Sequence, residues 1–318
     1  MSARALVVAN PIAGSCTPEL VDAVERRCAQ HVRQVTTVWT EGPDAAVALV
    51  EQALADARTE GAPLDLVVAV GGDGTVREVA EGIARAGGAW PDGDVAERPA
   101  LLVIPSGGGN STYRALWGER AWEDAVEEAL GLGRTVVRTL DLARIAEDER
   151  ATLLGYNTGL LGRIAELRRA SRGNAGEETY YAAIQQAIEE LESYPQRVTV
   201  DGRVLYEGST MMTTVGGVRR FGRGAFELLP RSVLDDGVLD ICVIGEVPRE
   251  LFGEFAALIS TGGHLERAEV EYAQGARVTI ERLDGKSLVA EHDGDTCPTG
   301  SVATIEIVPR AVPALAAL

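Results

Sequence analysis

Residues Gly71, Gly72, Asp73, Gly74 and Thr75 have the types and spacing of a phosphate-binding turn. They follow an apolar run at 64–70 and precede a helical pattern. Where a strand leads into a helix N-terminus, free backbone amides attract phosphate oxygens. Asp73 would repel phosphate unless a cation lay between them, and Mg²⁺ bridging carboxylate and phosphate is the usual solution. The alternative is that Asp73 only stabilises the turn or caps the following helix.

Other nucleotide-binding patterns fail in this sequence. The turn does not read G-x-G-x-x-G, and a G-x-x-x-x-G-K-[ST] loop cannot exist because Lys286 is the only lysine. An anionic ligand must therefore be held by arginines, backbone amides or a metal ion.

Length and charge narrow the class of protein. The chain has 318 residues, which favours two domains, and 48 acidic against 30 basic residues give a net charge of −18. Such a charge disfavours nucleic acid and allows at most transient contact with anionic membranes. The cysteines and histidines lack the spacing of a disulfide framework or a zinc site. No apolar stretch is long enough to span a bilayer and no signal-peptide pattern is present, so we expect a cytoplasmic protein.

The first third alternates buried strands with amphipathic helices. Apolar, β-branched runs at 4–10, 35–40, 64–70 and 100–105 predict strands, and Thr17 or Asp44 can cap the helices between them. This alternation predicts a Rossmann-like α/β domain with a parallel sheet. Ligands bind such sheets at the carboxyl ends of the strands, where 10–15 and 71–75 fall.

From about residue 134 the pattern becomes short strands separated by Gly and Asp turns, which predicts a mostly antiparallel β-sandwich. We expect two helices in it, near 177–192 and 248–260. The predicted domains are a nucleotide-binding domain at 1–133, to which 304–318 could return, and a substrate domain at 134–303. The joint at 131–135 is short, which favours domains packed around a cleft.

Six motifs, in order, resemble the diacylglycerol kinase catalytic family, which includes bacterial lipid kinases and sphingosine kinases. They are NPIAG (10–14), GGDGTVREVAEGI (71–83), PSGGGNSTYRAL (105–116), NTGLLG (157–162), VGGVRRFGRGAFELLPRSVLDDGVLD (215–240) and HDGD (292–295). The resemblance covers nearly the whole chain and implies the same two-domain fold.

The resemblance implies a binding site for ATP. Its residues would be Asn10, Pro11, Gly14, Thr40, Gly71, Gly72, Asp73, Gly74, Thr75, Gly107, Gly108, Gly109 and Asn110.

It also implies catalytic and metal roles. Asp73 would bind Mg²⁺ directly or through water, and Asp293 would be the base toward the acceptor hydroxyl. Asp295, where the family has glutamate, would help with the metal or with the base. Asp236 and the carbonyls of Val233 and Val238 would form a separate structural Mg²⁺ site. The alternative for that loop is a surface turn.

Three positions depart from the bacterial pattern of lysine, threonine and aspartate: Ile12, Gly108 and Ser111. Because the lysine, the threonine and the aspartate are absent together, the sequence suggests a different branch of the family. In that branch, Arg163 and the arginines of 216–224 are candidates to supply the positive charge. The alternative is that these arginines lie on a solvated loop.

The sequence thus predicts an ATP- and Mg²⁺-dependent kinase of lipid metabolism that phosphorylates a hydroxyl of a lipid or lipid-like alcohol. The alternatives are a kinase for a soluble alcohol or for NAD, and a nucleotide-binding regulator without catalysis. A homodimer is possible. The phenylalanines of 247–263 could line an acyl pocket or simply the core.

Overall fold

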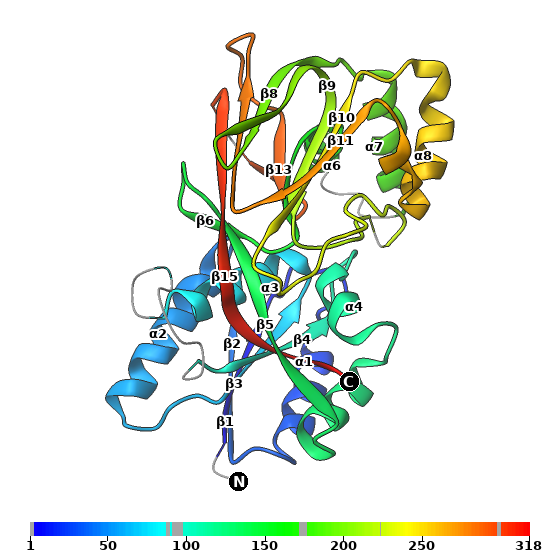
Figure 1. The fold of residues 1–318 in the computed structure, drawn as a ribbon. Coiled ribbons are helices and arrows are strands. Elements are labelled where there is room, and N and C mark those ends of the chain that lie inside the picture. The colour runs from blue at the N-terminus through cyan, green and yellow to red at the C-terminus, as the bar shows by residue number, and fades with distance from the viewer. Residues whose placement is uncertain (1–2, 87–89, 91–97, 172–176, 223, 298–299) are drawn as a thin grey trace. The chain divides into compact units, whose positions relative to one another are not determined.

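The computed structural model describes residues 3–86, 90, 98–171, 177–222, 224–297 and 300–318. The chain divides into two compact units. Unit 1 comprises Met1–Leu142, Leu234–Asp236 and Val308–Leu318, and unit 2 comprises Ala143–Val233 and Gly237–Ile307. The predicted joint at 131–135 lies just before a long strand, β5 (Thr135–Ile145), and the division falls inside that strand. The last strand, β15 (Val302–Ala317), likewise contributes residues to both units (Figure 1).

Unit 1 is built on four parallel strands in the order β4-β3-β1-β2. Their bounds are β1 Arg4–Ala9, β2 Gln34–Trp39, β3 Leu66–Gly71 and β4 Ala100–Pro105. The helices are α1 Pro18–Cys28, α2 Ala45–Thr59, α3 Asp73–Ala84, α4 Ser111–Trp117 and α5 Trp122–Val126, followed by the π-helical turn η1 Glu127–Gly131. The predicted parallel α/β domain is confirmed.

Burial explains why these strands read as continuous apolar runs. All six residues of β3 are buried, as are the four central residues of β4. Right-handed crossovers place α1 on one face of the sheet and α2 and α3 on the other. The helices α2 and α3 pack closely, since a Cβ on Gly82 would lie 2.8 Å from Cβ of Val50.

The two predicted helix caps have different outcomes. Thr17 caps α1, because its hydroxyl accepts a hydrogen bond from Leu20 N at 3.2 Å. The expectation for Asp44 was wrong: it has a left-handed backbone, with φ of 61°, and its side chain makes no cap bond. Glu78 instead accepts from Ala46 N at 3.1 Å, and Arg77 contacts Asp44.

Unit 2 is a mostly antiparallel arrangement, which confirms the predicted sandwich. Apart from β5 and β15, its strands are β6 Arg150–Thr152, β7 Gly155–Gly159, β8 Tyr194–Val200, β9 Arg203–Gly216, β10 Leu239–Gly245, β11 Val270–Gly275, β12 Arg277–Arg282, β13 Ala290–His292 and β14 Asp295–Cys297. The apolar core lies on one face of these strands and includes Tyr156, Val215 and Ile241.

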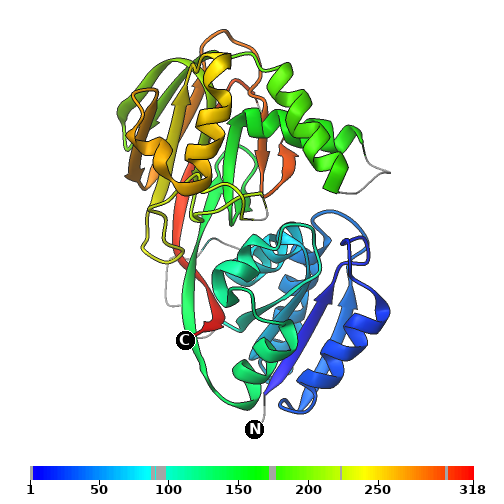
Figure 2. The ribbon, with the colours of Figure 1, turned by 90° about the vertical axis from the view of Figure 1, so that its right-hand side faces the viewer.

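The described part of unit 2 contains the α-helices α6 (Leu160–Ala170), α7 (Glu177–Glu189) and α8 (Phe252–Thr261), with short 3-10 turns η2 (Arg249–Leu251) and η3 (Gly263–Glu266). The sequence reading missed α6, which lies beside α7 (Figure 2). In α8, Phe255 and Ile259 are buried and Phe252 and Leu258 are half-buried. None of the described helices is long and apolar enough to cross a membrane.

Candidate active site

In unit 1, the first glycine loop joins β3 to α3 and leaves no room for a side chain at Gly71. A Cβ on Gly71 would lie 2.4 Å from Cβ of Thr75, so this position requires glycine. The helix begins at Asp73, and the amides of its first turn have no carbonyl partner within the helix. Such amides suit a phosphate group.

A second glycine loop, at residues 107–110, packs directly on the first. A Cβ on Gly107 would come within 2.3 Å of Cα of Gly72, so the two backbones touch. Asn110 closes this loop: its Oδ1 accepts from Gly107 N, and its Nδ2 donates to Gly107 O, both at 2.9 Å. Asn110 has φ of 54°, a left-handed conformation that Asn tolerates better than most residues.

The loop after β1 joins the same group. Nδ2 of Asn10 donates to Oγ1 of Thr75 at 2.9 Å, and Ser15 N donates to the carbonyl of Ser106 at 2.8 Å. Pro11 and Gly14 lie exposed in this loop. Thr40, which is buried after β2, donates its amide to Ala9 O at 2.9 Å. The residues predicted to hold a nucleotide thus gather at the carboxyl edge of one parallel sheet.

Asp73 has an unexpected structural contact. Its Oδ2 accepts from Ser111 N at 3.0 Å and its Oδ1 from Thr112 N at 2.9 Å. The carboxylate therefore caps α4, whereas the sequence suggested a cap for its own helix. Ser111, one of the departures from the bacterial pattern, takes part through its backbone amide, which any residue type other than proline would offer.

A metal ion fits Asp73 only as a shared ligand. A carboxylate oxygen can accept from more than one partner, so a cation or its water would share Asp73 with its present contacts. Among the described residues, no group of three or more His, Cys, Asp and Glu side chains is placed to hold a metal. Phosphate oxygens or water would have to supply the remaining ligands.

The acidic loop at 233–238 contains one clear ion pair. Arg138 binds Asp235 through Nε at 2.9 Å and through Nη2, and these bonds hold the pKa of Asp235 below its usual value. Asp236 is exposed and belongs to unit 1, whereas Val233 and Val238 belong to unit 2. The Mg²⁺ site proposed for these residues stays a prediction.

In unit 2, the segment HDGD forms a tight hairpin turn between β13 and β14. His292 pairs with Asp295, and the two residues between them have φ of 51° and 90°. Two successive left-handed residues define the type I′ turn that an Asp-Gly pair favours.

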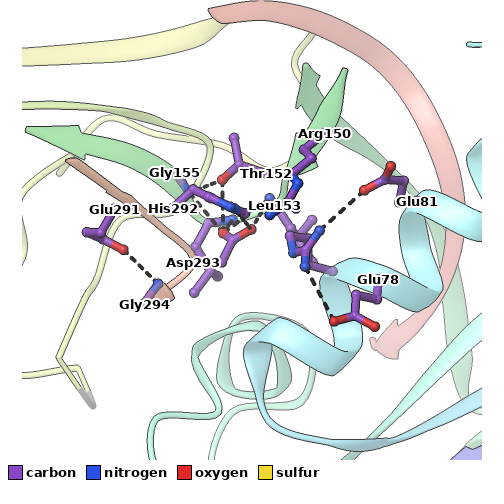
Figure 3. A network of polar contacts seen from close by, with 12 residues as sticks. Glu78, Glu81, Arg150, Thr152, Leu153, Gly155, Glu291, His292, Asp293 and Gly294 are labelled. Atoms are coloured by element: carbon purple, nitrogen blue, oxygen red, sulfur yellow. Dashed lines mark hydrogen bonds and ion pairs between the residues drawn. The ribbon is translucent and has the colours of Figure 1, made fainter. Parts of the chain in front are cut away.

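Asp293 is anchored by donors from the β6–β7 connection (Figure 3). Its carboxylate accepts from Thr152 Oγ1 at 3.0 Å, Leu153 N at 3.1 Å, Leu154 N at 2.6 Å and Gly155 N at 3.3 Å. The residue is only 9% exposed. Asp295, by contrast, is exposed at the start of β14.

The sequence reading missed Glu291, two residues before Asp293. Its side chain is buried, with Oε2 accepting from Gly294 N at 2.7 Å and Oε1 bonded to Asn157 Nδ2. Burial, followed by the nearby charges of Asp293 and Asp295, raises the pKa of Glu291 to about 8. A single Glu inside a three-residue strand gave no signal that could have identified it.

The arginines considered as a source of positive charge are paired with glutamates. Arg219 and Arg220 each contact Glu227 at 2.7 Å, and Arg163 contacts Glu190 at 2.6 Å and Glu166 at 2.9 Å. Position 223 lies outside the described residues. The arginines at 163, 219 and 220 therefore serve local ion pairs in the structure described here.

The chain matches models of kinase domains, a class of phosphotransferase, in both of its units. Two family models cover most of the chain: the diacylglycerol kinase catalytic domain at residues 4–145, and the YegS C-terminal NAD kinase beta sandwich-like domain at residues 156–316. The chain belongs to the diacylglycerol kinase family with a C-terminal domain of the YegS type, so the predicted family is confirmed.

Relatives agree with this placement. A Bacillus subtilis protein named diacylglycerol kinase is 26% identical over 283 residues, covering 87% of this chain and 85% of its own. A crystal structure of a putative diacylglycerol kinase from Bacillus anthracis has a TM-score of 0.75 at 21% identity, covering 99% of this chain and 95% of its own. An Archaeoglobus fulgidus NAD kinase in complex with ATP has a TM-score of 0.52 at 14% identity, covering 98% of this chain and 92% of its own, which shows a shared fold only.

Proposed function

We propose that this protein transfers a phosphoryl group from ATP, with Mg²⁺, to a hydroxyl of a lipid or lipid-like alcohol. The observation that carries the proposal is the contact between the two glycine loops of unit 1. Gly72 and Gly107 bring two stretches of backbone together at the edge where α3 begins, and Asn10 fixes Thr75 beside them. Phosphates bind such backbone without needing lysine.

Each part of the proposed site has a separate task. The backbone amides of 71–75 and of Gly108 and Gly109 hold the nucleotide phosphates. Asp73 and phosphate oxygens hold Mg²⁺, which neutralises the charge of the transferring group. The turn at 293–295 supplies the carboxylate that takes the proton of the acceptor hydroxyl. Asp293 is the base predicted from the sequence, and its anchoring fixes where that carboxylate points.

The acceptor is proposed from the family. The name of the Bacillus subtilis relative, diacylglycerol kinase, favours a lipid alcohol. The fold is also that of an NAD kinase, so NAD belongs among the acceptors to be tested.

The experiment is an acceptor screen with labelled ATP and Mg²⁺. The acceptors are diacylglycerol, sphingoid bases, other acyl or prenyl alcohols, a set of water-soluble alcohols, and NAD. We expect labelled product with a lipid alcohol in mixed micelles. If NADP is the only labelled product, the acceptor is NAD and the lipid alcohol is wrong. ATP binding without any labelled product would favour a non-catalytic regulator.

A further inference from the structure

His292 places a buried imidazole directly before the proposed base. It is the last residue of β13, where it lies opposite Tyr156 of β7. Alternate residues of a strand point to the same face of a sheet, so His292 shares the face of Ala290. Ala290 and Tyr156 both belong to the apolar core of unit 2. Since His292 is only 1% exposed, solvent has no access to its ring.

Both ring nitrogens of His292 lack a hydrogen-bond partner among the residues that the structure describes. A neutral imidazole has one N–H donor and one acceptor lone pair. Each of these costs free energy when it is buried without a partner. An apolar side chain would fill the same place in the core without that cost. The imidazole therefore suits a state of the protein in which at least one nitrogen has a partner.

The carboxylate of Asp293 is within reach of the ring. Nδ1 of His292 lies 3.9 Å from Oδ2 of Asp293 (Figure 3). The donors of the β6–β7 connection all bond Oδ1, and of these donors Leu153 N also contacts Oδ2, at 3.1 Å. The separation between Nδ1 and Oδ2 exceeds an ordinary N–H···O bond by about 1 Å. A small shift of the ring or of the carboxylate would therefore complete a bond.

We propose that His292 is a positioning residue, which donates Nδ1–H to Oδ2 of Asp293 in the reacting complex. This role rests on the proposed function, in which Asp293 is the base. Catalytic hydrogen bonds are often long in the absence of ligands and shorten when the substrates are bound. A base that is oriented by a third group is a recurrent arrangement in enzymes. His292 would fix the direction of the carboxylate from the core, and the β6–β7 connection fixes it through Oδ1.

The role requires a neutral ring with its proton on Nδ1. The hydrogen bond made by one ring nitrogen sets the tautomer of the imidazole. The carboxylate of Asp293 attracts the proton to the nitrogen that faces it, which leaves the lone pair of Nε2 toward the core. A charged ring would need a second partner, for Nε2–H. His292 neither gains nor loses a proton in this role, and the proton of the acceptor hydroxyl goes to Asp293.

The first test identifies the tautomer and needs no turnover. The ¹⁵N chemical shifts of a neutral imidazole differ between the nitrogen that carries the proton and the nitrogen that does not. The chain has three histidines, so the signals of His292 are those that disappear in His292→Asn. We expect the proton of His292 on Nδ1 in the protein without ligands, because the charge of Asp293 is already 3.9 Å away. A proton on Nε2 would overturn the proposal.

The second test compares two amide substitutions. The side-chain nitrogen of Asn can occupy the place of Nδ1, whereas that of Gln can occupy the place of Nε2. His292→Gln should lower kcat roughly 10- to 100-fold, the range for residues that orient a reacting group through another. His292→Asn should keep kcat within about threefold of wild type, and neither variant should change KM for ATP. Equal values of kcat in the two variants would contradict a role for Nδ1.

His264→Asn is the control for loss of a buried imidazole. His264 is also fully buried in unit 2, where its Nε2 bonds the carbonyl of Leu228 at 3.2 Å. Its substitution should lower the melting temperature and leave kcat of the folded protein unchanged. A loss of kcat as large as that of His292→Gln would show that packing, and not Nδ1, explains the effect. If wild type phosphorylates none of the acceptors, the proposed function fails, and the tautomer still decides whether His292 donates toward Asp293.

Discussion

The two regions that carry acidic motif residues are organised in different ways. In unit 1 the loops of 71–75 and 107–110 are held by glycine backbones in direct contact, and Asp73 is half-buried with two amide donors. In unit 2 the 293–295 turn is held by side chains, with Asp293 accepting from one hydroxyl and three amides and Glu291 buried beneath it. A close backbone contact that requires glycine leaves a glycine in the sequence. The burial of a carboxylate and its bonds to main-chain amides leave no such mark.

The two aspartates therefore have different structural duties besides any chemistry. Asp73 supports one helix start by accepting from two amides. Asp293 connects a hairpin to a turn some 140 residues earlier in the chain. Substitution at the second position should cost stability as well as rate, and substitution at the first mainly rate.

Gly107→Ala should have the largest effect, because it disrupts the contact between Gly107 and Gly72 in unit 1. The added Cβ would lie 2.3 Å from Cα of Gly72, so one loop must move. We expect loss of ATP binding by calorimetry and destabilisation of about 1–3 kcal/mol, typical of overpacking. Gly42→Ala is the matched control, since no atom lies within 4 Å of the new Cβ. Normal ATP affinity in Gly107→Ala would show that the contact does not shape the site.

Asp293→Asn addresses the side-chain organisation of unit 2. An amide has one acceptor atom and cannot satisfy all the donors that surround the carboxylate, so stability should fall by about 1–3 kcal/mol. Because Asp293 is the predicted base, the substitution should also lower kcat roughly 10²- to 10⁴-fold and change ATP affinity only a few-fold. Denaturant unfolding and steady-state kinetics on the same sample separate the two effects.

Asp295→Asn is the companion variant for that experiment. Asp295 is exposed at the start of β14, so its substitution should leave the melting temperature unchanged. A crippling effect of Asp295→Asn on kcat, with a mild effect of Asp293→Asn, would exchange their roles and leave Asp293 as the anchor of the turn.

Much of unit 1 could be predicted because its strands are buried on both faces and its loops contain glycine at the positions of close contact. The four strands at the start of the chain and the cap at Thr17 follow from local pattern. Asp44 failed as a cap because its backbone is left-handed and Glu78, from another helix, takes its place. Local sequence does not reveal which distant side chain will reach a helix end.

Unit 2 was predictable as a class but not at its site. Alternation and turn residues indicated an antiparallel sandwich, yet α6 was missed, and only its first three residues were read, as the end of the motif at 157–162. The donors of Asp293 are mostly backbone amides, which carry no residue-type signal. The burial of Glu291 depends on α6 and β7, which pack on β13 only in the folded chain.

Asp73→Asn should have a smaller effect on stability than Asp293→Asn and still impair turnover. The loss of charge weakens the cap on α4 by about 1 kcal/mol. Removal of a Mg²⁺ ligand should lower kcat roughly 10²-fold. The apparent affinity for Mg²⁺, measured by titration of activity, should weaken in parallel. Near-normal turnover would reduce Asp73 to the capping role seen in its contacts with Ser111 and Thr112.

Asp236→Ala should have the smallest effect, and it tests whether a metal ion helps to organise the chain around 233–238. If the Asp236 carboxylate and nearby carbonyl oxygens share Mg²⁺, removal of the carboxylate should weaken binding of the ion. Wild type should then gain a few degrees of melting temperature on addition of Mg²⁺ without nucleotide, by mass action on the folded state. Asp236→Ala should lose that gain, whereas Asp73→Asn should keep it, because the two sites are distinct.

The neighbouring Asp235→Ala breaks the ion pair with Arg138 and should lower the melting temperature equally with and without Mg²⁺. An equal Mg²⁺ response in wild type and Asp236→Ala would leave 233–238 as a surface turn that needs no metal.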